Sequence, residues 1–236
     1  MFFDEHPRFY ETSETSPYRG RLNLRYEAIF AENREIFTGA RVLDIASHDG
    51  RWSLAALKTG AAEVVGIEAR GELVRAAHEN LERYGAGEAQ YRFVAGDVFE
   101  VLGREAFKAD VVLCLGYLYH TLRYNELMRR IKDVNPRYLV LDSVVLPRPD
   151  EPVVRLRLDR NARQGNAVAD SFSYGEATLV GWPSVPALEL LVQAFGFEID
   201  RFSDWGALLR DNPTLGGVDD YAEGRRVTAL CVAAGD

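Results

Sequence analysis

The amino-acid sequence predicts an α/β protein: a seven-stranded, mostly parallel sheet with helices on both faces. Residues 41–68 have the pattern of a strand, a tight polar turn, a helix and a second strand, and this connection requires a parallel pair of strands. Further apolar runs at 91–95, 110–115 and 138–145 alternate with segments of helical periodicity. The run 110–115 (DVVLCL) is apolar after its first residue, as expected of a central strand covered on both faces.

Length and composition restrict the protein class. A chain of 236 residues with 47% hydrophobic residues suits one domain with a substantial core. No apolar run approaches the ~20 residues of a membrane helix, and the first residues lack the basic and apolar regions of a signal peptide. Cys114 and Cys231 each lie in an apolar run, which predicts buried, unpaired thiols. We therefore expect a cytoplasmic protein.

The net charge of −8 argues against nucleic acid as a partner but does not exclude a small anionic substrate.

The first 40 residues are expected to form a helical segment that precedes the main domain at 41–236. Residues 1–20 could be a frayed tail or a lid over the site. Leu22–Phe37 has the apolar spacing of one amphipathic helix. Its arginines are expected on a solvated face paired with nearby glutamates rather than on a bound anion: Arg19, Arg21, Arg25 and Arg34.

The turn after the first strand has the chemistry of a nucleotide site. A strand–turn–helix connection gathers free backbone N–H groups at the carboxyl edge of the sheet, and Glu68 ends the next strand, where an acid can bind a ribose diol. A dinucleotide site needs G-x-G-x-x-G. Here only Gly50 is a glycine, and a pyrophosphate would meet the side chains of Ser47, His48 and Asp49. The turn therefore predicts an adenosine-bearing cofactor other than a dinucleotide.

The spacing resembles motif I of the class I S-adenosylmethionine (SAM) methyltransferases, usually D-x-G-x-G-x-G. Asp44 takes the acidic position, while Ala46, His48 and Gly50 fall on the three glycine positions. The resemblance implies a Rossmann-like fold, SAM as cofactor and direct displacement of its methyl group. It also implies a set of cofactor-binding residues: Asp44, Ala46, Ser47, His48, Gly50, Trp52, Glu68, Ala69, Asp97, Val98 and Leu115.

Three segments also resemble the group related to the tRNA wobble-uridine carboxymethyltransferase: Asp49–Trp52, Leu118–His120 and Trp182–Phe197. The carboxymethylating relative has a long N-terminal extension with basic residues. About 40 residues precede the first strand here, so we expect plain SAM rather than its carboxylated form.

Asp97 follows the third strand, Tyr91–Ala95, where the methyltransferase pattern places an acid that faces the adenine amino group. We favour that role because Glu68 and Asp97 both fall at strand ends in register with motif I. The alternative is an acid that caps the next helix, at 98–105.

Residues 116–121 follow the central strand at the edge where open α/β sheets bind ligands. The candidate catalytic residues are His120, Tyr117 and Tyr119. An imidazole could take a proton from a substrate hydroxyl or amine, or His120 could order the loop. No H-x-x-H or C-x-x-C spacing suggests a metal site.

The remaining chain should complete the sheet. A helix is expected at 125–134, followed by an insertion at 147–183 with one or two antiparallel strands and a polar stretch typical of a mobile cover. Arg155, Arg157 and Arg160 are expected on an exposed strand face rather than on substrate. Ser184 is placed to cap the next helix. Strands follow at 196–202 and 226–233, the last antiparallel, with a loop-rich connection at 206–217.

Together these features predict a SAM-dependent methyltransferase that acts on an O or N nucleophile of a small molecule. Two alternatives stay open. One is a tRNA-modifying methyltransferase, and the other is a SAM-binding protein without catalysis, which the altered motif I would permit.

Overall fold

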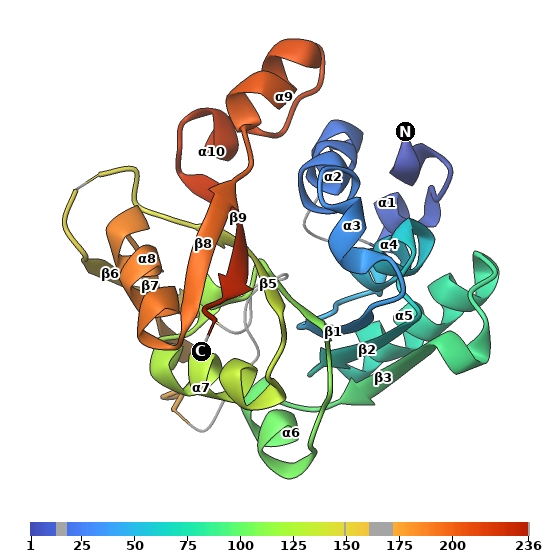
Figure 1. The fold of residues 1–236 in the computed structure, drawn as a ribbon, viewed down its shortest axis with the longest axis horizontal. Helices are drawn as coiled ribbons and strands as arrows, with labels where there is room; N and C mark the ends of the chain where they lie inside the picture. The colour runs from blue at the N-terminus through green and yellow to red at the C-terminus, as the bar shows by residue number, and fades with distance from the viewer. Residues whose placement is uncertain (13–17, 149, 161–171, 236) are drawn as a thin grey trace.

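Seven strands form the main sheet, in the order β3-β2-β1-β4-β5-β9-β8 (Figure 1). The structure is a computed structural model that describes residues 1–12, 18–148, 150–160 and 172–235. The strands are β1 (Arg41–Ile45), β2 (Glu63–Glu68), β3 (Tyr91–Ala95), β4 (Val111–Leu115), β5 (Tyr138–Val144), β8 (Phe197–Phe202) and β9 (Arg226–Ala233). Strands β1 to β5 pair in parallel, and β9 is antiparallel to both β5 and β8. The predicted fold, including the antiparallel last strand, is confirmed.

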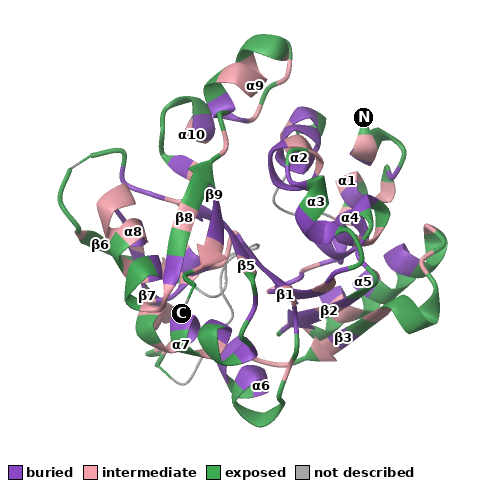
Figure 2. Ribbon diagram, viewed as in Figure 1, coloured by how far each residue is buried: buried purple, intermediate pink, exposed green. Residues whose placement is uncertain are grey.

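Helices cover both faces of this sheet. One face is covered by α4 (Arg51–Thr59), α5 (Gly71–Arg83) and the N-terminal segment; the other by α6 (Val98–Arg104), α7 (Tyr124–Val134) and α8 (Val185–Ala194). Side chains of β4 alternate between two buried clusters, with Val111 and Leu113 in one and Val112 and Cys114 in the other. Figure 2 shows the resulting buried strands between exposed outer helix faces.

The N-terminal segment packs against α4 and α5 through short helices. These are a 3₁₀ turn (Phe2–Asp4), α1 (Arg8–Thr12), α2 (Arg19–Tyr26), a π-helical turn (Glu27–Ala31) and α3 (Arg34–Phe37). Phe3 and Phe9 are fully buried, so residues 1–12 are not a frayed tail. The predicted single helix over 22–37 is wrong. Asn33 donates from its side chain to the Ala28 and Ile29 carbonyl groups, at 3.1 and 3.0 Å, and so satisfies carbonyls left free where the helix breaks.

Of the arginines of α2, Arg25 is buried and Arg21 is partly buried, and neither is fully solvated. Arg21 pairs with Asp220 of α10 (Asp219–Ala222) at 2.6 Å, and Arg25 pairs with Asp142 of β5 at 3.1 Å. The prediction of a solvated face was wrong for both residues, because carboxylates distant in sequence approach the same helix.

The connection predicted as a loop at 206–217 contains α9 (Trp205–Asp211). Asp204 caps this helix by accepting from the Ala207 N–H at 2.8 Å. Leu208 and Leu209 pack against the small cluster formed by α2, Trp205 and α10. The packing of these leucines explains why a helix forms despite Gly206.

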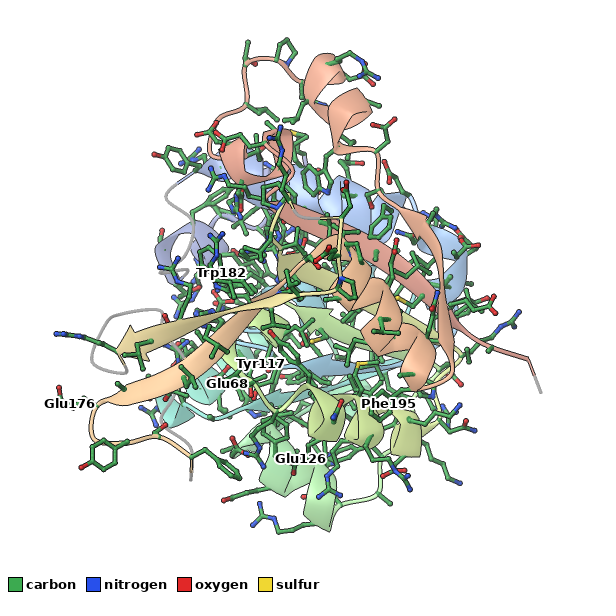
Figure 3. The ribbon with its side chains drawn as sticks, turned by 90° about the vertical axis from the view of Figure 1, so that its left-hand side faces the viewer. Glu68, Tyr117, Glu126, Glu176, Trp182 and Phe195 are labelled. Carbon is green, nitrogen blue, oxygen red and sulfur yellow. The ribbon has the colours of Figure 1, made fainter. Side chains whose placement is uncertain are left out.

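The insertion after β5 forms a separate antiparallel hairpin of β6 (Val154–Arg160) and β7 (Ala177–Pro183). Figure 3 shows it as a long two-stranded ribbon, with Trp182 labelled toward its base and Glu176 at its far end. Arg155, Arg157 and Arg160 are exposed, as predicted. The Ser184 hydroxyl accepts from the Ala187 N–H at 3.2 Å, which confirms the predicted cap of α8. Residues 161–171 of the predicted cover lie outside the described residues.

Both cysteines are buried and unpaired, and burial raises the pKa of each thiol to about 12. Among the described residues, every helix is too short or too polar to cross a lipid bilayer.

Candidate active site

The turn after β1 has the backbone conformation of a glycine-rich loop although two of its three glycine positions carry side chains. Ala46, His48 and Gly50 have φ angles of 55°, 54° and 78°. These are the three positions that the motif I spacing assigned to glycine. A left-handed conformation is costly for residues with a Cβ atom and is maintained only where the surroundings impose it. The structure therefore keeps the shape of the motif through packing rather than through glycine.

Three elements hold this turn through Asp49. The Asp49 carboxylate is fully buried and accepts from Arg51 Nε and the Thr12 hydroxyl, both at 2.7 Å. Asn80 of α5 donates to the Asp49 carbonyl oxygen at 2.9 Å. Burial alone would raise the pKa of Asp49, but the Arg51 guanidinium beside it holds that pKa well below the usual range.

The imidazole of His48 lies beside the Arg51 guanidinium. Its Nδ1 contacts the Arg51 guanidinium, and its Nε2 is buried without a hydrogen-bond partner in the described part of the chain. Burial and the adjacent Arg51 charge lower the pKa of His48. Ser47 also has a buried hydroxyl that lacks a partner among the described residues, while its backbone N–H donates to the Ile67 carbonyl at 2.9 Å.

Asp44, in β1, is buried below the turn and accepts from the Ser53 hydroxyl at 2.7 Å. Burial raises its pKa to about 7, against the opposing effects of that hydrogen bond and of Arg51, while Glu68 and Asp49 add to the rise. The motif I acid is thus close to half-ionised at neutral pH.

Glu68 ends β2 beside the turn, and both of its carboxylate oxygens accept backbone hydrogen bonds. The His48 N–H donates to Oε2 and the Arg70 N–H to Oε1, each at 3.0 Å. Arg70 Nε also lies 3.5 Å from Oε1, while Oε2 keeps a second lone pair. The residue can therefore fix the turn and accept from a ligand at the same time.

The loop after β4 carries the three candidate catalytic residues. His120 is half-buried, and its Nδ1 lies 3.1 Å from Asp159 Oδ2 of the β6–β7 hairpin. The Tyr119 ring packs against the His120 imidazole, and its hydroxyl accepts from Arg226 at 3.2 Å. Tyr117 is half-buried and its ring lies 6.4 Å from that of Phe99. The insertion thus supplies an acid to the loop at the carboxyl edge of the sheet.

Residues 42–135 match the family model described as a methyltransferase domain. The chain contains a class I SAM-dependent methyltransferase domain. The predicted methyltransferase class and its methyl donor, SAM, are therefore confirmed.

Relatives and solved structures agree with this assignment of the domain. A putative ribosomal RNA large subunit methyltransferase of Methanocaldococcus jannaschii is 35% identical over 95 residues, which cover 39% of this chain and 24% of that protein. Ribosomal protein L11 methyltransferase of Escherichia coli is 36% identical over 76 residues, 32% of this chain and 24% of that protein. The chain thus spans about a quarter of the length of these curated relatives. A crystal structure of the N-terminal domain of EvdMO1, in the presence of SAH and D-fucose, has the same fold with a TM-score of 0.60. It is 17% identical, and the match covers 99% of this chain and 96% of that one.

The methyltransferase domain offers partners for a SAM molecule along the carboxyl edge of β1 and β2. Three groups could be satisfied by a polar ligand: the buried Ser47 Oγ and His48 Nε2, which lack partners in the described structure, and the second lone pair of Glu68 Oε2. The observed residues therefore fit the cofactor.

Other predicted cofactor residues lie in different surroundings. Asp97 caps α6, since its Oδ1 accepts from the Phe99 and Glu100 N–H groups at 2.9 and 3.1 Å. This is the alternative role given to Asp97 above, a helix cap. Its Oδ2 takes no part in these two hydrogen bonds. Leu115 and Val98 are buried in the core, and Ala69 is exposed beside Glu68.

Trp52 is a core residue of the methyltransferase domain. It is buried, stacks on Phe30 with ring centroids 5.9 Å apart, and packs edge-on against Phe3 at 5.4 Å. This environment accounts for its aromatic side chain without a cofactor, and we leave it out of the proposed binding set.

Sequence reasoning missed two groups near the site. Asp159 is 39 positions from His120, in an insertion whose strand pairing no local pattern reveals. Asp142 is a buried acid within β5. Burial alone would raise its pKa, but Arg226 and Arg25 hold that pKa well below the usual range. The acidic residue inside the apolar strand YLVLDSV was the signal that could have drawn attention to Asp142.

Proposed function

We propose that the chain transfers the methyl group of SAM to an oxygen or nitrogen nucleophile of a small molecule, with His120 as the general base. The observation that carries this proposal is the 3.1 Å contact between His120 Nδ1 and Asp159 Oδ2, at the loop after β4. A histidine oriented by a carboxylate is suited to accept a proton from an attacking hydroxyl or amine.

The contact between His120 and Asp159 gives each imidazole nitrogen of His120 a separate role. With the Asp159 carboxylate accepting from Nδ1–H, the lone pair of a neutral His120 is on Nε2, which can take the proton of the acceptor. The imidazolium that forms is stabilised by the adjacent carboxylate. Tyr119 packs against the imidazole, while Tyr117 lies on the same loop and is the next candidate for acceptor contact.

The cofactor, when bound, supplies an electrophilic methyl group on a sulfonium. In this proposal the cofactor would be held by Asp44, the turn at 46–50, Glu68, Asp97, Val98 and Leu115. These residues bind and orient, so proximity and alignment are the main contributions of the domain to the rate.

A second candidate is methylation of RNA or of a ribosomal protein. The names of the two curated relatives favour it, and so does the resemblance of Leu118–His120 and Trp182–Phe197 to the wobble-uridine group. The net charge of −8 opposes it for RNA, because a phosphate backbone needs a basic surface. A third candidate, binding of SAM without catalysis, is motivated by the side chains at Ala46 and His48.

The test begins with transfer of a labelled methyl group from SAM. The protein is incubated with a fractionated small-metabolite extract, with total RNA and with ribosomal protein. Label in a small-molecule fraction supports the proposal, and label only in RNA or protein supports the second candidate. SAM binding with label in no fraction supports the third, and absence of SAM binding contradicts all three.

Variants of the pair then test the base. His120→Ala should lower turnover by roughly 10²–10⁴-fold with nearly unchanged SAM affinity, whereas His78→Ala, at an exposed histidine of α5, is the matched control. Asp159→Asn removes the carboxylate beside the imidazole and should also lower turnover with nearly unchanged SAM affinity. Full turnover in both variants would remove this pair from the mechanism.

A further inference from the structure

The β6–β7 hairpin presents an apolar face to solvent. Opposite residues of an antiparallel pair share a face, and the register places Leu156 opposite Gly181 and Leu158 opposite Leu179. Leu156, Leu158 and Leu179 are 60%, 71% and 44% exposed. A contiguous patch of large apolar side chains is a mark of an interaction surface.

The other strand of the hairpin, β7, is turned toward the body of the domain. The Tyr124 hydroxyl donates to the Gly181 carbonyl oxygen at 2.6 Å, and Val180 is buried. β7 also packs on the 3₁₀ turn Leu118–His120. In β6, by contrast, every residue except Asp159 is exposed. Figure 3 shows the hairpin extending away from the body, and β6 is its outer strand.

The outer edge of β6 carries backbone groups that can pair with another strand. The Ser184 N–H donates to the Val153 carbonyl oxygen at 2.9 Å. In an antiparallel ladder, residues bonded to the neighbouring strand alternate with residues whose N–H and C=O groups point outward. The backbone groups of Leu156 and Leu158 therefore point away from β7, and among the described strands β6 pairs with β7 alone. An exposed edge of this kind is a template for a strand of another chain.

The sequence of β6 is complementary to itself in the antiparallel direction. A two-fold axis through Arg157 places Leu156 opposite Leu158 of a second copy. The same axis places Arg155 opposite Asp159 of that copy, so that leucine meets leucine and a base meets an acid. An axis through Leu156 would instead place Arg155 opposite Arg157, and an axis through Leu158 would leave the first two residues of β6 unpaired. The register centred on Arg157 is therefore favoured.

The charges near the axis are compatible with this register. Two arginines directly opposite each other repel, but the guanidinium of Arg157 lies over the Trp182 ring, 4.0 Å from its centroid. Trp182 belongs to β7, so the two charges are drawn away from the axis. Asp159, which would face Arg155 of the second copy, also contacts His120 at 3.1 Å. The interface therefore reaches the carboxylate beside the candidate base.

We propose that β6 pairs with β6 of a second copy of this chain, antiparallel and about a two-fold axis at Arg157. The two hairpins then form one continuous sheet. Leu179 and Leu158 pack beside Leu156 of the second copy in a row across that sheet. One strand from each copy makes a small interface, so the dimer is weak, with a dissociation constant on the order of micromolar. This inference goes beyond the proposed function and does not depend on it.

The first test is sedimentation equilibrium of the full chain from roughly 1 to 300 μM, and a reversible monomer–dimer equilibrium is expected. Leu158→Glu places a carboxylate against Leu156 of the second copy and should weaken the dimer by about tenfold or more. Leu190→Glu, at a leucine of α8 that is 57% exposed, is the matched control and should leave the dissociation constant unchanged. A monomer at every concentration, or a dimer that Leu158→Glu does not weaken, overturns the proposal.

Cysteine cross-linking tests the register. In a pair that is not hydrogen-bonded, opposite Cα atoms lie about 4.5 Å apart, within the range of a disulfide. Arg157→Cys should therefore form a disulfide between copies under mild oxidation, because Cys114 and Cys231 are buried and do not compete. Arg201→Cys, on β8 at the edge of the main sheet, is the control and should stay reduced. Cross-linking of Arg201→Cys but not of Arg157→Cys would place the dimer at β8 and overturn the proposal.

Phospholipid vesicles separate a second copy from a lipid surface, since leucines beside arginines are also typical of segments that bind anionic membranes. The full chain is mixed with vesicles of phosphatidylcholine and phosphatidylserine and floated on a density gradient. The chain should remain with the unbound protein. Flotation that Leu158→Glu abolishes, together with a monomer in solution, would assign the apolar face to a membrane and overturn the pairing of two copies.

Discussion

The buried acid of motif I should make the stability of the protein depend on pH in a way that one substitution removes. Asp44 has a pKa of about 7 in the folded protein, against an ordinary value of 3.8. The folded state therefore binds a proton that the unfolded chain releases between these two values. Stability from this group is present at low pH and is lost as pH rises toward the folded pKa.

The magnitude follows from the two pKa values. At pH 5 Asp44 is mostly protonated in the folded state and mostly ionised in the unfolded state, and by pH 8 it is ionised in both. The linkage relation gives a loss of about 2.5 kcal/mol between these pH values. Asp44→Asn keeps an oxygen that accepts from Ser53 but cannot ionise, so the variant should gain about 2.5 kcal/mol relative to wild type over the same interval.

The assay is urea unfolding of both proteins at several pH values from 5 to 8, analysed as the difference in unfolding free energy. Other titrating groups are shared by the two proteins and largely cancel in this difference. Asp133→Asn, at a solvent-exposed carboxylate paired with Arg129, is the matched control and should give a flat difference. Parallel stability curves for wild type and Asp44→Asn would show that Asp44 is ionised throughout and would refute the burial argument.

Two further predictions concern the same edge of the sheet. Glu68→Ala removes the acceptor of two backbone N–H groups and the proposed acceptor for the ribose. The free energy of SAM binding, measured by calorimetry, should therefore weaken by about 1.5–3 kcal/mol. An unchanged dissociation constant would mean that Glu68 has no contact with the cofactor. Ala46→Gly should change the unfolding free energy by less than about 0.5 kcal/mol, because relief of the left-handed backbone strain offsets the added entropy of the unfolded chain. Ala46→Val should lower the unfolding free energy by about 1–2 kcal/mol. Equal stability of these two variants in urea would contradict a left-handed conformation at this position.

The sequence was informative where structure is encoded locally. The unit from β1 to β2 occupies 28 consecutive residues, 41–68, and its apolar runs, turn and acid fall in a fixed order. The spacing placed Ala46 and His48 on glycine positions of the motif, and both have a left-handed backbone in the structure. Spacing therefore outweighed residue identity in this motif, because the strand and helix on either side fix the path of the turn.

The polar contacts that complete the site were not accessible in the same way. Arg25 and Asp142 are 117 positions apart, and each alone has an ordinary local explanation as a helix surface charge or a strand-end acid. Trp52 shows a different difficulty: its position after the turn suggested a ligand, whereas the structure packs it between Phe3 and Phe30. Burial and long-range pairing decide such cases, and a single sequence does not display them.

The order of strands in the sheet also bears on how the chain folds. β9 lies between β5 and β8, although β8 precedes it in sequence, and within the described residues β8 has no other neighbour in the sheet (Figure 1). During synthesis, β8 is made before the strand that will hold it, and the apolar edge of β5 stays unpaired until residues 226–233 arrive. Such an open edge favours association between chains in partly folded states. A truncation after residue 225 would delete β9 and would also detach β8 from the sheet, because β8 pairs with β9.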